Sequence, residues 1–284
     1  MKASELVLAT DGSLYHIRLT ADTLADRVIL VGDPERVNMF KSIFESIEHE
    51  SLNRELHALT GRYHGCRLTV LSTGMGCDNI DIVMTELDAA ANIADGNIRT
   101  DRRHLQVVRI GTCGSLQADV DCGSHVASRY AVGMDGLMHS YREWDAPLPD
   151  MDRLFATHTG IAPPLATPYC VECSPRLMAA IGQGMVQGIT ATAPGFYGPQ
   201  GRTIRLHPAL PDLNLRLASF SYGGLPLTNL EMETSAIYGF SHLLGHEALT
   251  ACLVIANRQR GTFLSDYHEP MRQLVASVVE RLSA

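Results

Sequence analysis

Short apolar runs that end in glycine turns constrain the fold of this chain most strongly. They are rich in β-branched side chains and cover residues 27–31, 67–71 and 105–110. The turns that follow them begin at Gly32, Ser72 and Gly111. Continuous apolar runs of this length are typical of strands that are buried on both faces of a sheet. We therefore expect parallel strands whose glycine turns meet at one edge.

Helical patterns lie between and after these runs. Apolar residues recur at helical spacing over residues 80–94, and similar patterns predict helices over 230–246 and 271–282. Residues 248–256 read as one more buried strand. Strands that alternate with helices predict an α/β sheet covered on both faces. We found no linker or repeat, so one domain is expected over residues 1–284, with residues 139–175 left unassigned.

Composition excludes several classes of protein. The net charge is −8, and the basic residues are scattered, which argues against a nucleic-acid binder. Hydrophobic residues make up 45% of the chain, as expected of a globular protein with a sizeable core. No apolar segment reaches the roughly 18 residues of a membrane helix, and the N-terminus lacks a signal-peptide core. A cytoplasmic protein without membrane partners is expected.

The cysteines do not suggest a disulfide framework. There are seven, an odd number, and they have no regular spacing, so we expect reduced thiols. Cys170 and Cys173 form a single C-x-x-C pair, whereas a structural zinc site needs four ligands. No metal site is therefore predicted.

The first glycine turn has the features of an anion site. Gly32 lets an anion approach the backbone, and Asp33 and Pro34 read as the N-cap and first position of a helix whose free N–H groups favour negative charge. Arg36 would lie on the first turn of that helix. A plain helix cap, with Arg36 on the solvent face, is the alternative.

Arg109 is the second sign of an anion. An arginine near the end of an apolar strand is costly to bury unless it meets a negative group. A ligand anion is the favoured partner, and a structural carboxylate is the alternative. Thr112, three residues on, can donate its hydroxyl and its backbone N–H to phosphate or to ribose.

Two later segments carry groups suited to a sugar and a base. Glu231, Met232 and Glu233 lie at the start of the predicted helix, where carboxylates can accept from sugar hydroxyls or simply favour the helix dipole. The glycine- and proline-rich loop 195–201 carries Phe196, Gln200 and, just beyond it, Arg202. An aromatic ring can lie against a flat heterocycle, and the amide and guanidinium would share one side of an extended loop. Simple packing of the aromatic residues is the alternative.

These segments, in this order, resemble the nucleoside phosphorylase-I family, and in particular its uridine-type members. The resemblance runs from about Tyr15 to the C-terminal helix and weakens between about 138 and 186. It implies a three-layer α-β-α fold with a central mixed twisted sheet, as in nucleoside phosphorylases and hydrolases. It also implies a pentosyltransferase that cleaves uridine with phosphate, needs no cofactor, and forms a homodimer or a hexamer (a trimer of dimers) with shared active sites.

The resemblance assigns site residues one by one. The phosphate-binding positions are Gly32, Arg36, Arg109, Thr112 and, from a neighbouring subunit, Arg54. The ribose-binding positions are Thr112, Met232, Glu233 and, across the dimer, His16. The base-binding positions are Phe196, Gln200 and Arg202, with Glu231 and Arg258 as further candidates. Arg109, Gln200 and Arg202 would carry the catalysis.

Departures from the family pattern bear on specificity. Purine-specific members carry an aspartate at the end of the last strand, where this chain has Asn257 and Arg258. Leu230 replaces an aromatic residue that is common in uridine-type members. Asn79 replaces a serine that helps the position of Glu55 to hold a monovalent cation between subunits, so that cation is not expected here.

Four alternative functions remain open at this point. A purine nucleoside phosphorylase and a nucleosidase would share the fold, although the arginines at 36, 54 and 109 favour phosphate over water. A dinucleotide-binding oxidoreductase would use Gly74 and Gly76 after a strand, with Asp95 about 20 residues on, but Asn79 stands at the third glycine. A non-catalytic nucleoside-binding protein is the fourth.

Overall fold

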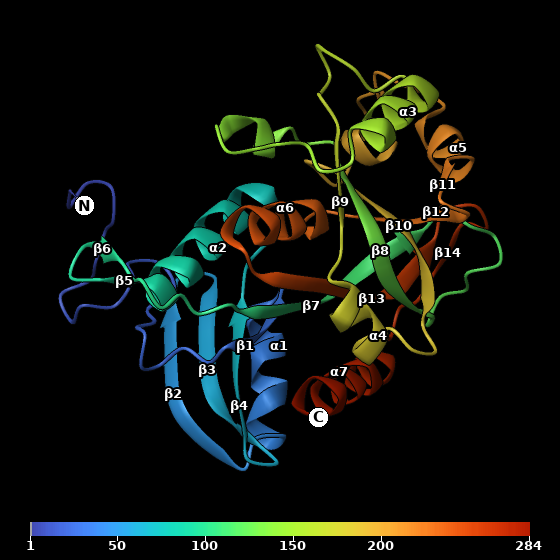
Figure 1. The fold of residues 1–284 in the computed structure, drawn as a ribbon. Coiled ribbons are helices and arrows are strands. Elements are labelled where there is room, and N and C mark those ends of the chain that lie inside the picture. Colours follow the sequence, from blue (N-terminus) through green and yellow to red (C-terminus); the bar gives the residue numbers. More distant parts are fainter. Residues whose placement is uncertain (1) are drawn as a thin grey trace.

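The computed structural model describes residues 2–284 (Figure 1). The strands are β1 (Arg27–Val31), β2 (Ser46–Asn53), β3 (Leu56–Tyr63), β4 (Cys66–Ser72), β5 (Ile93–Ala94), β6 (Asn97–Ile98), β7 (Gln106–Ser115), β8 (His125–Gly133), β9 (Tyr169–Glu172), β10 (Val186–Thr192), β11 (Ser221–Tyr222), β12 (Leu225–Glu231), β13 (Glu247–Asn257) and β14 (Thr262–Phe263). The α-helices are α1 (Pro34–Val37), α2 (Cys77–Asn92), α3 (Pro149–Thr159), α4 (Pro175–Ile181), α5 (Leu213–Ala218), α6 (Thr234–Leu244) and α7 (His268–Ser283). The 3₁₀ turns are η1 (Asn38–Ser42), η2 (Leu137–Ser140) and η3 (Gly198–Gln200).

One mixed sheet organises the molecule. Its strands follow the order β11-β12-β10-β8-β13-β7-β1-β4-β3-β2. Strand β1 runs parallel to its neighbours β4 and β7, and β7 runs parallel to β13. Strand β3 is antiparallel to both of its neighbours, β2 and β4. A further pairing of β12 with β7 closes β7, β13, β8, β10 and β12 into a ring. Strand β7 therefore belongs both to this ring and to the open half of the sheet.

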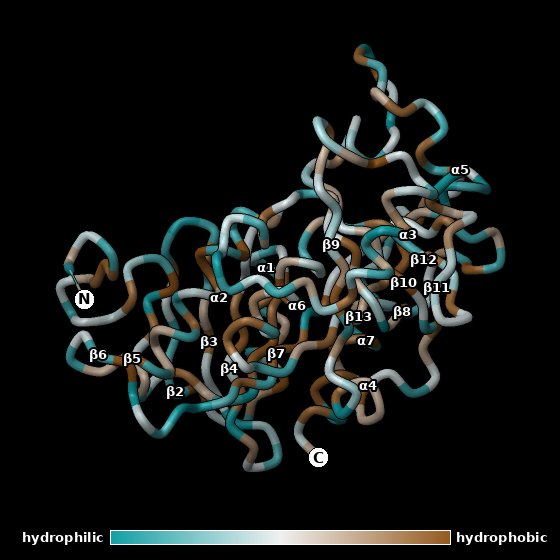
Figure 2. Tube along the Cα trace, turned by 45° about the horizontal axis from the view of Figure 1, so that its top comes forward, coloured by the Kyte–Doolittle hydropathy of each residue, from teal (hydrophilic) through white to brown (hydrophobic). Residues whose placement is uncertain are grey.

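Helices cover both faces of this sheet (Figure 1). Helices α2 and α6 pack together along one face, and α4 and α7 pack together on the opposite face. Hydrophobic residues concentrate along the central strands between these layers (Figure 2), where Val28–Val31 of β1 are all buried. The fold is thus the expected three-layer α/β fold with a mixed sheet. Among residues 2–284, no helix has both the length and the apolar character needed to cross a membrane.

Most of the elements expected from the sequence are confirmed. The runs 27–31, 67–71 and 248–256 lie in β1, β4 and β13, and residues 271–282 lie in α7. The helix expected over 80–94 is α2, which ends at Asn92 because Ile93 and Ala94 pair with β6 instead.

The third glycine turn was predicted wrongly. Strand β7 continues through Gly111 to Ser115, and the next element is a strand, β8, not a helix. The strand continues because β13 pairs with it as far as Ser115 and β12 pairs with Gly114 and Ser115. These partners are distant in sequence, so the local pattern did not reveal them.

Two other segments differ from expectation or were unassigned. The helix expected from Leu230 begins only at Thr234, because Leu230 and Glu231 pair with β10 as the end of β12. The unassigned stretch 139–175 contains helix α3 and strand β9, which pairs with β8.

Candidate active site

A cavity of about 740 Å³ opens at the carboxyl ends of the parallel strands β1, β4, β7 and β13. Most of the predicted site residues line it: Gly32, Arg36, Arg109, Thr112, Phe196, Gln200, Arg202, Glu231, Met232, Glu233 and Arg258. His16 and Arg54 are not part of this lining. The fold therefore brings the phosphate, ribose and base segments of one chain together.

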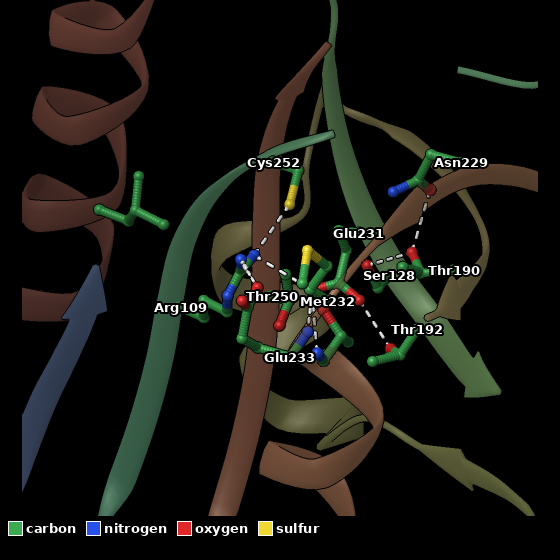
Figure 3. A network of polar contacts seen from close by, with 12 residues as sticks. Arg109, Ser128, Thr190, Thr192, Asn229, Glu231, Met232, Glu233, Thr250 and Cys252 are labelled. Carbon is green, nitrogen blue, oxygen red and sulfur yellow. Dashed lines mark hydrogen bonds and ion pairs between the residues drawn. The ribbon is translucent and has the colours of Figure 1, made fainter. Parts of the chain in front are cut away.

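Arg109 forms the buried centre of the site (Figure 3). Arg109 is only 5% exposed. Its guanidinium donates to Glu233 Oε2, and its Nη1 lies 3.4 Å from Glu231 Oε2. Nη1 also donates to Cys252 Sγ at 3.3 Å. Burial would lower the pKa of Arg109, but the two carboxylates outweigh it and hold that pKa above its usual value. Structural carboxylates thus balance the buried charge, and Arg109 still faces the cavity.

Glu231 orients the start of helix α6. Its Oε2 accepts from the backbone N–H groups of Glu233 and Thr234, both at 2.9 Å, and its Oε1 accepts from Thr192 Oγ1 at 2.6 Å. Glu231 lies in β12 and not in the helix, yet it satisfies N–H groups that the helix leaves free. This arrangement holds Glu233 against Arg109.

Glu233 is fixed from a second side. Its Oε1 accepts from the backbone N–H of Gly76 at 2.7 Å, in the turn between β4 and α2. Burial raises the pKa of Glu233, and the guanidinium of Arg109 opposes that rise. A buried carboxylate with a fixed direction is well suited to accept from paired sugar hydroxyls.

The first glycine turn has the predicted cap, and the helix that follows it is short. Asp33 Oδ1 accepts from the N–H of Glu35 at 2.9 Å, and α1 ends at Val37. Arg36 does not lie on the solvent face: it is half-buried, and its Nη1 donates to the carbonyl of Ile110 at 3.1 Å. Burial, and then the charge of Arg109, lower the pKa of Arg36. The charge of Arg36, which borders the same cavity as Arg109, would favour an anion there.

Gly111 makes room for the side chain of Arg109. A Cβ at this strand position would lie 1.9 Å from Arg109 Nη1. The sequence predicted a turn here, but the glycine is required because the guanidinium passes directly over the strand.

We expect Gly111→Ala to push Arg109 away from Glu233. The dissociation constant for phosphate, the anion predicted here, should then rise about tenfold or more, since a displacement of about 1 Å at a site can cost up to a hundredfold. Titration with phosphate measures this effect, and circular dichroism confirms that the fold is kept. If the constant for phosphate does not change, Arg109 keeps its position despite the added methyl group.

The residues predicted to bind the base are held together by a tight turn. The expected extended loop is wrong: Gly198–Gln200 form η3, Gly201 adopts a left-handed conformation, and the N–H of Arg202 donates to the Tyr197 carbonyl at 2.9 Å. The turn still brings the two polar side chains together, because Arg202 Nη1 donates to Gln200 Oε1 at 2.6 Å. Arg202 also lies 3.8 Å from the centre of the Phe196 ring.

A second arginine borders the same turn. Arg258 Nη2 donates to the carbonyl of Gln200 at 3.2 Å, and its buried Nη1 has no partner among the described residues. Burial lowers the pKa of Arg258, and burial together with the charge of Arg258 lowers that of Arg202. These donors can meet a flat ring with carbonyl oxygens on its edge.

Comparison with known proteins identifies the family of this chain. The family model described as "Phosphorylase superfamily" matches residues 26–283. The chain belongs to the phosphorylase superfamily.

Individual relatives of this superfamily match most of the chain. A uridine phosphorylase from Thermococcus kodakarensis is 29% identical over 96% of this chain and 88% of its own length. A DeoD-type purine nucleoside phosphorylase from Anoxybacillus flavithermus is 34% identical over 84% of this chain and 85% of its own. The structure of a Trypanosoma brucei nucleoside phosphorylase, described as showing uridine phosphorylase activity, superposes with a TM-score of 0.86. It is 32% identical and covers 98% of this chain and 100% of its own.

The two residues outside the cavity lie toward the open edge of the sheet. Arg54 is exposed in the turn between β2 and β3, with a left-handed backbone conformation (φ 55°). His16 is half-buried and its Nδ1 lies 2.5 Å from Glu86 Oε1. Neither contacts the cavity of its own chain.

The positions that depart from the family pattern also have clear contacts. Asn79 Nδ2 donates to Glu55 Oε1 at 3.3 Å, so the amide engages the carboxylate that would hold the cation in the family pattern. Leu230 is buried and lines the cavity. Cys170 and Cys173 are buried free thiols, and residues 2–284 contain no group of three or more His, Cys, Asp or Glu that could hold a metal ion.

A larger cavity of about 980 Å³ lies on the other side of the base-binding turn. It shares Arg202 with the site and is lined mostly by apolar residues, among them Ile161, Leu165 and Leu206. We place the active site in the smaller cavity because that cavity holds the buried charges and the strand ends.

Sequence reasoning missed the roles of three contributors to the site. Gly76 and Thr192 act through hydrogen bonds to the two glutamates, and Cys252 contacts Arg109 from β13. A threonine or cysteine within an apolar strand is ordinary, so only the pairing of the strands identifies these residues.

Proposed function

We propose that this chain is a uridine phosphorylase, which converts uridine and phosphate reversibly into uracil and ribose 1-phosphate. The observation that carries the proposal is the meeting of Arg36 and Arg109 with Gln200 and Arg202 in one cavity. The first pair is suited to a phosphate dianion and the second to the carbonyl edge of a pyrimidine. The names of the Thermococcus and Trypanosoma relatives support the same activity.

Phosphate and ribose would bind at the strand ends. Arg36, Arg109 and Thr112 would donate to phosphate, and the backbone at Gly32 leaves room for it. Glu233 would accept from the 2′- and 3′-hydroxyls of ribose, and Met232 would pack on the sugar. Positioning of both reactants is a large part of the rate acceleration in such a reaction.

The leaving base would be stabilised by the turn around η3. The C1′–N1 bond breaks toward an oxocarbenium-like sugar, as in glycoside cleavage, and its electron pair stays on uracil. Gln200 and Arg202 would donate to the base oxygens as charge develops, while Phe196 lies against the ring. A phosphate oxygen then forms the new bond to C1′. The proton that hydrogen phosphate loses balances the one that uracil gains, and phosphate is the only co-substrate.

A purine nucleoside phosphorylase is the second candidate, because curated purine enzymes also match this chain. Arg258 disfavours it: this side chain lines the base end of the cavity and cannot act as an acid for a purine nitrogen near neutral pH. Membership of the phosphorylase superfamily removes the dinucleotide-binding alternative. A nucleosidase and a non-catalytic binding protein are outcomes of the test.

The test is base release from uridine, thymidine, inosine and adenosine, each with and without phosphate. We expect fast release from uridine that depends on phosphate. Release without phosphate would identify a nucleosidase, faster release from inosine a purine enzyme, and binding without release a binding protein. Each of those results would overturn the proposal.

We further propose a homodimer, or a trimer of dimers, with active sites shared between subunits. Arg54 would reach the phosphate of a neighbour from its exposed turn, and His16 would reach the 5′-hydroxyl. We also propose that residues 1–284 act as one domain in the cytoplasm, where the seven free cysteines would stay reduced. A bound monovalent cation is not part of this proposal.

Mixing two inactive variants tests the shared site. Arg54→Ala and Arg202→Ala subunits, each inactive alone, should regain activity when they are unfolded together and refolded. In a hybrid dimer one site recovers both wild-type side chains, so at most about a quarter of the wild-type activity is expected from random pairing. Full activity of a proven monomer, or no recovery in proven hybrids, would contradict the shared site.

A further inference from the structure

His57 lies beneath the phosphate turn and contacts its backbone. It is the second residue of β3 and is only 6% exposed. Its Nδ1 lies 3.2 Å from the carbonyl oxygen of Pro34, and its Nε2 lies 2.8 Å from Glu50 Oε1. Pro34 is the first residue of α1 and lines the cavity. A buried side chain therefore joins the antiparallel strands to the turn at the phosphate end of the site.

Helix α1 is short, and the Pro34 carbonyl lacks the usual α-helical bond at its end. In a longer helix this carbonyl would accept from the N–H four residues on. Here that residue is Asn38, whose N–H donates to the carbonyls of Glu35 and Arg36 instead. The imidazole Nδ1 therefore lies against a carbonyl that the N–H four residues on does not use.

Glu50 holds the ring in place from the other side. Glu50 Oε1 also accepts from Lys41 Nζ at 2.6 Å, and Lys41 and His57 together lower the pKa of Glu50. Both neighbours of the ring are acceptors, so a ring with protons on both nitrogens satisfies both, whereas a neutral ring donates to only one.

We propose that His57 is a positioning residue for phosphate, which fixes the Pro34 carbonyl and so aims the turn from Gly32 to Arg36 at the anion. This inference rests on the phosphate site of the proposed function. His57 does not line the cavity and would act only through Pro34. Loss of the contact between His57 and Pro34 should therefore weaken phosphate binding. It should not change the contacts with base and ribose, which come from other elements.

Two substitutions separate the two ends of the ring. An asparagine amide can take the place of Nδ1, whereas a glutamine amide reaches that of Nε2. We expect His57→Gln to raise the KM for phosphate about five- to tenfold, the effect of one lost hydrogen bond, with kcat and the KM for uridine unchanged. His57→Asn keeps the donor to Pro34, so its phosphate KM should stay within about twofold of wild type.

His125→Asn is the matched control, because an asparagine amide does not reach the place of Nε2 and so loses the contact with the Pro270 carbonyl. His125 Nε2 also lies close to a proline carbonyl, that of Pro270 at 3.3 Å, but on β8 and outside the lining of the active site. Its kinetic constants should not change. If His57→Gln does not fold, Glu50→Gln tests the same point by loosening the ring, with a smaller rise in the phosphate KM.

Some results would overturn the inference. An unchanged phosphate KM in a folded His57→Gln protein would do so, and so would an equal rise in the constants for phosphate and uridine, which indicates a merely structural role. If the wild-type enzyme itself does not depend on phosphate, the proposed function fails and this inference fails with it. The wild-type assay therefore separates the two failures.

Discussion

Replacing Arg109 with methionine is expected to lower kcat/KM for phosphate by about a hundredfold or more, the effect of removing one well-aimed charged donor. Arg109 also compensates Glu231 and Glu233, which lie in the same buried cluster. Removing one partner of a buried ion pair leaves an unpaired charge and typically costs about 3–5 kcal/mol of stability. The variant should therefore lose both phosphate use and free energy of unfolding.

Chemical denaturation at several pH values distinguishes the two effects. Burial raises the pKa of Glu233, and the methionine variant lacks the guanidinium that opposes this rise. Its loss of stability should be complete above that raised pKa and should shrink as the pH falls through it, because a protonated carboxyl needs no cation. Arg109→Lys, which keeps the charge, should lose less stability than the methionine variant. Unchanged saturation by phosphate in a folded methionine variant would show that Arg109 is purely structural.

Arg202→Ala is expected to slow uridine cleavage by about a hundredfold to a thousandfold without creating activity on inosine. The alanine removes a donor to the base and also the partners of Gln200 Oε1 and the Phe196 ring. It does not supply an acid at position 258, so a purine still lacks a proton donor. Turnover of both nucleosides, measured in the presence of phosphate, checks this result.

Arg205→Ala provides the control for this variant. Arg205 lies three residues further along the chain, is exposed, and is not part of the lining of the active site. Its loss should leave uridine turnover unchanged. For the wild-type protein, uridine should be cleaved far faster than inosine, since buried polar groups left unpaired by a purine each cost about 1–3 kcal/mol. Comparable rates on the two nucleosides would contradict the assignment of the base site.

Local sequence patterns predicted the elements that depend on local rules. The apolar run 27–31 ends at a glycine and is followed by an Asp–Pro helix start, and the structure has this strand and cap. An arginine inside an apolar strand indicated that Arg109 needs a negative partner, and it has two. The resemblance of four separate segments to one family then predicted a set of site residues. Most of these residues line one cavity in the structure.

Features that depend on distant strand pairing could not be predicted. Gly111 looked like a turn residue because a glycine after an apolar run commonly ends a strand, but pairing with β13 extends the strand past it. Glu231 looked helical because it lies within the helical apolar pattern of 230–246, and it is instead the end of β12. The contact of His57 with Pro34 joins β3 to the start of α1, and β2 lies between them in the chain. No spacing in the sequence indicates this contact.

In the proposed reaction, the ion pair between Arg109 and Glu233 would also link the two substrates thermodynamically. Phosphate would draw donors of Arg109 away from Glu233, which leaves a buried carboxylate short of hydrogen bonds. The ribose hydroxyls supply those bonds, so each substrate should bind more tightly when the other is present. Such a coupling free energy is reciprocal: uridine must raise the affinity for phosphate by the same factor that phosphate raises the affinity for uridine. One buried contact would thus make the complex of both substrates the favoured state of the enzyme.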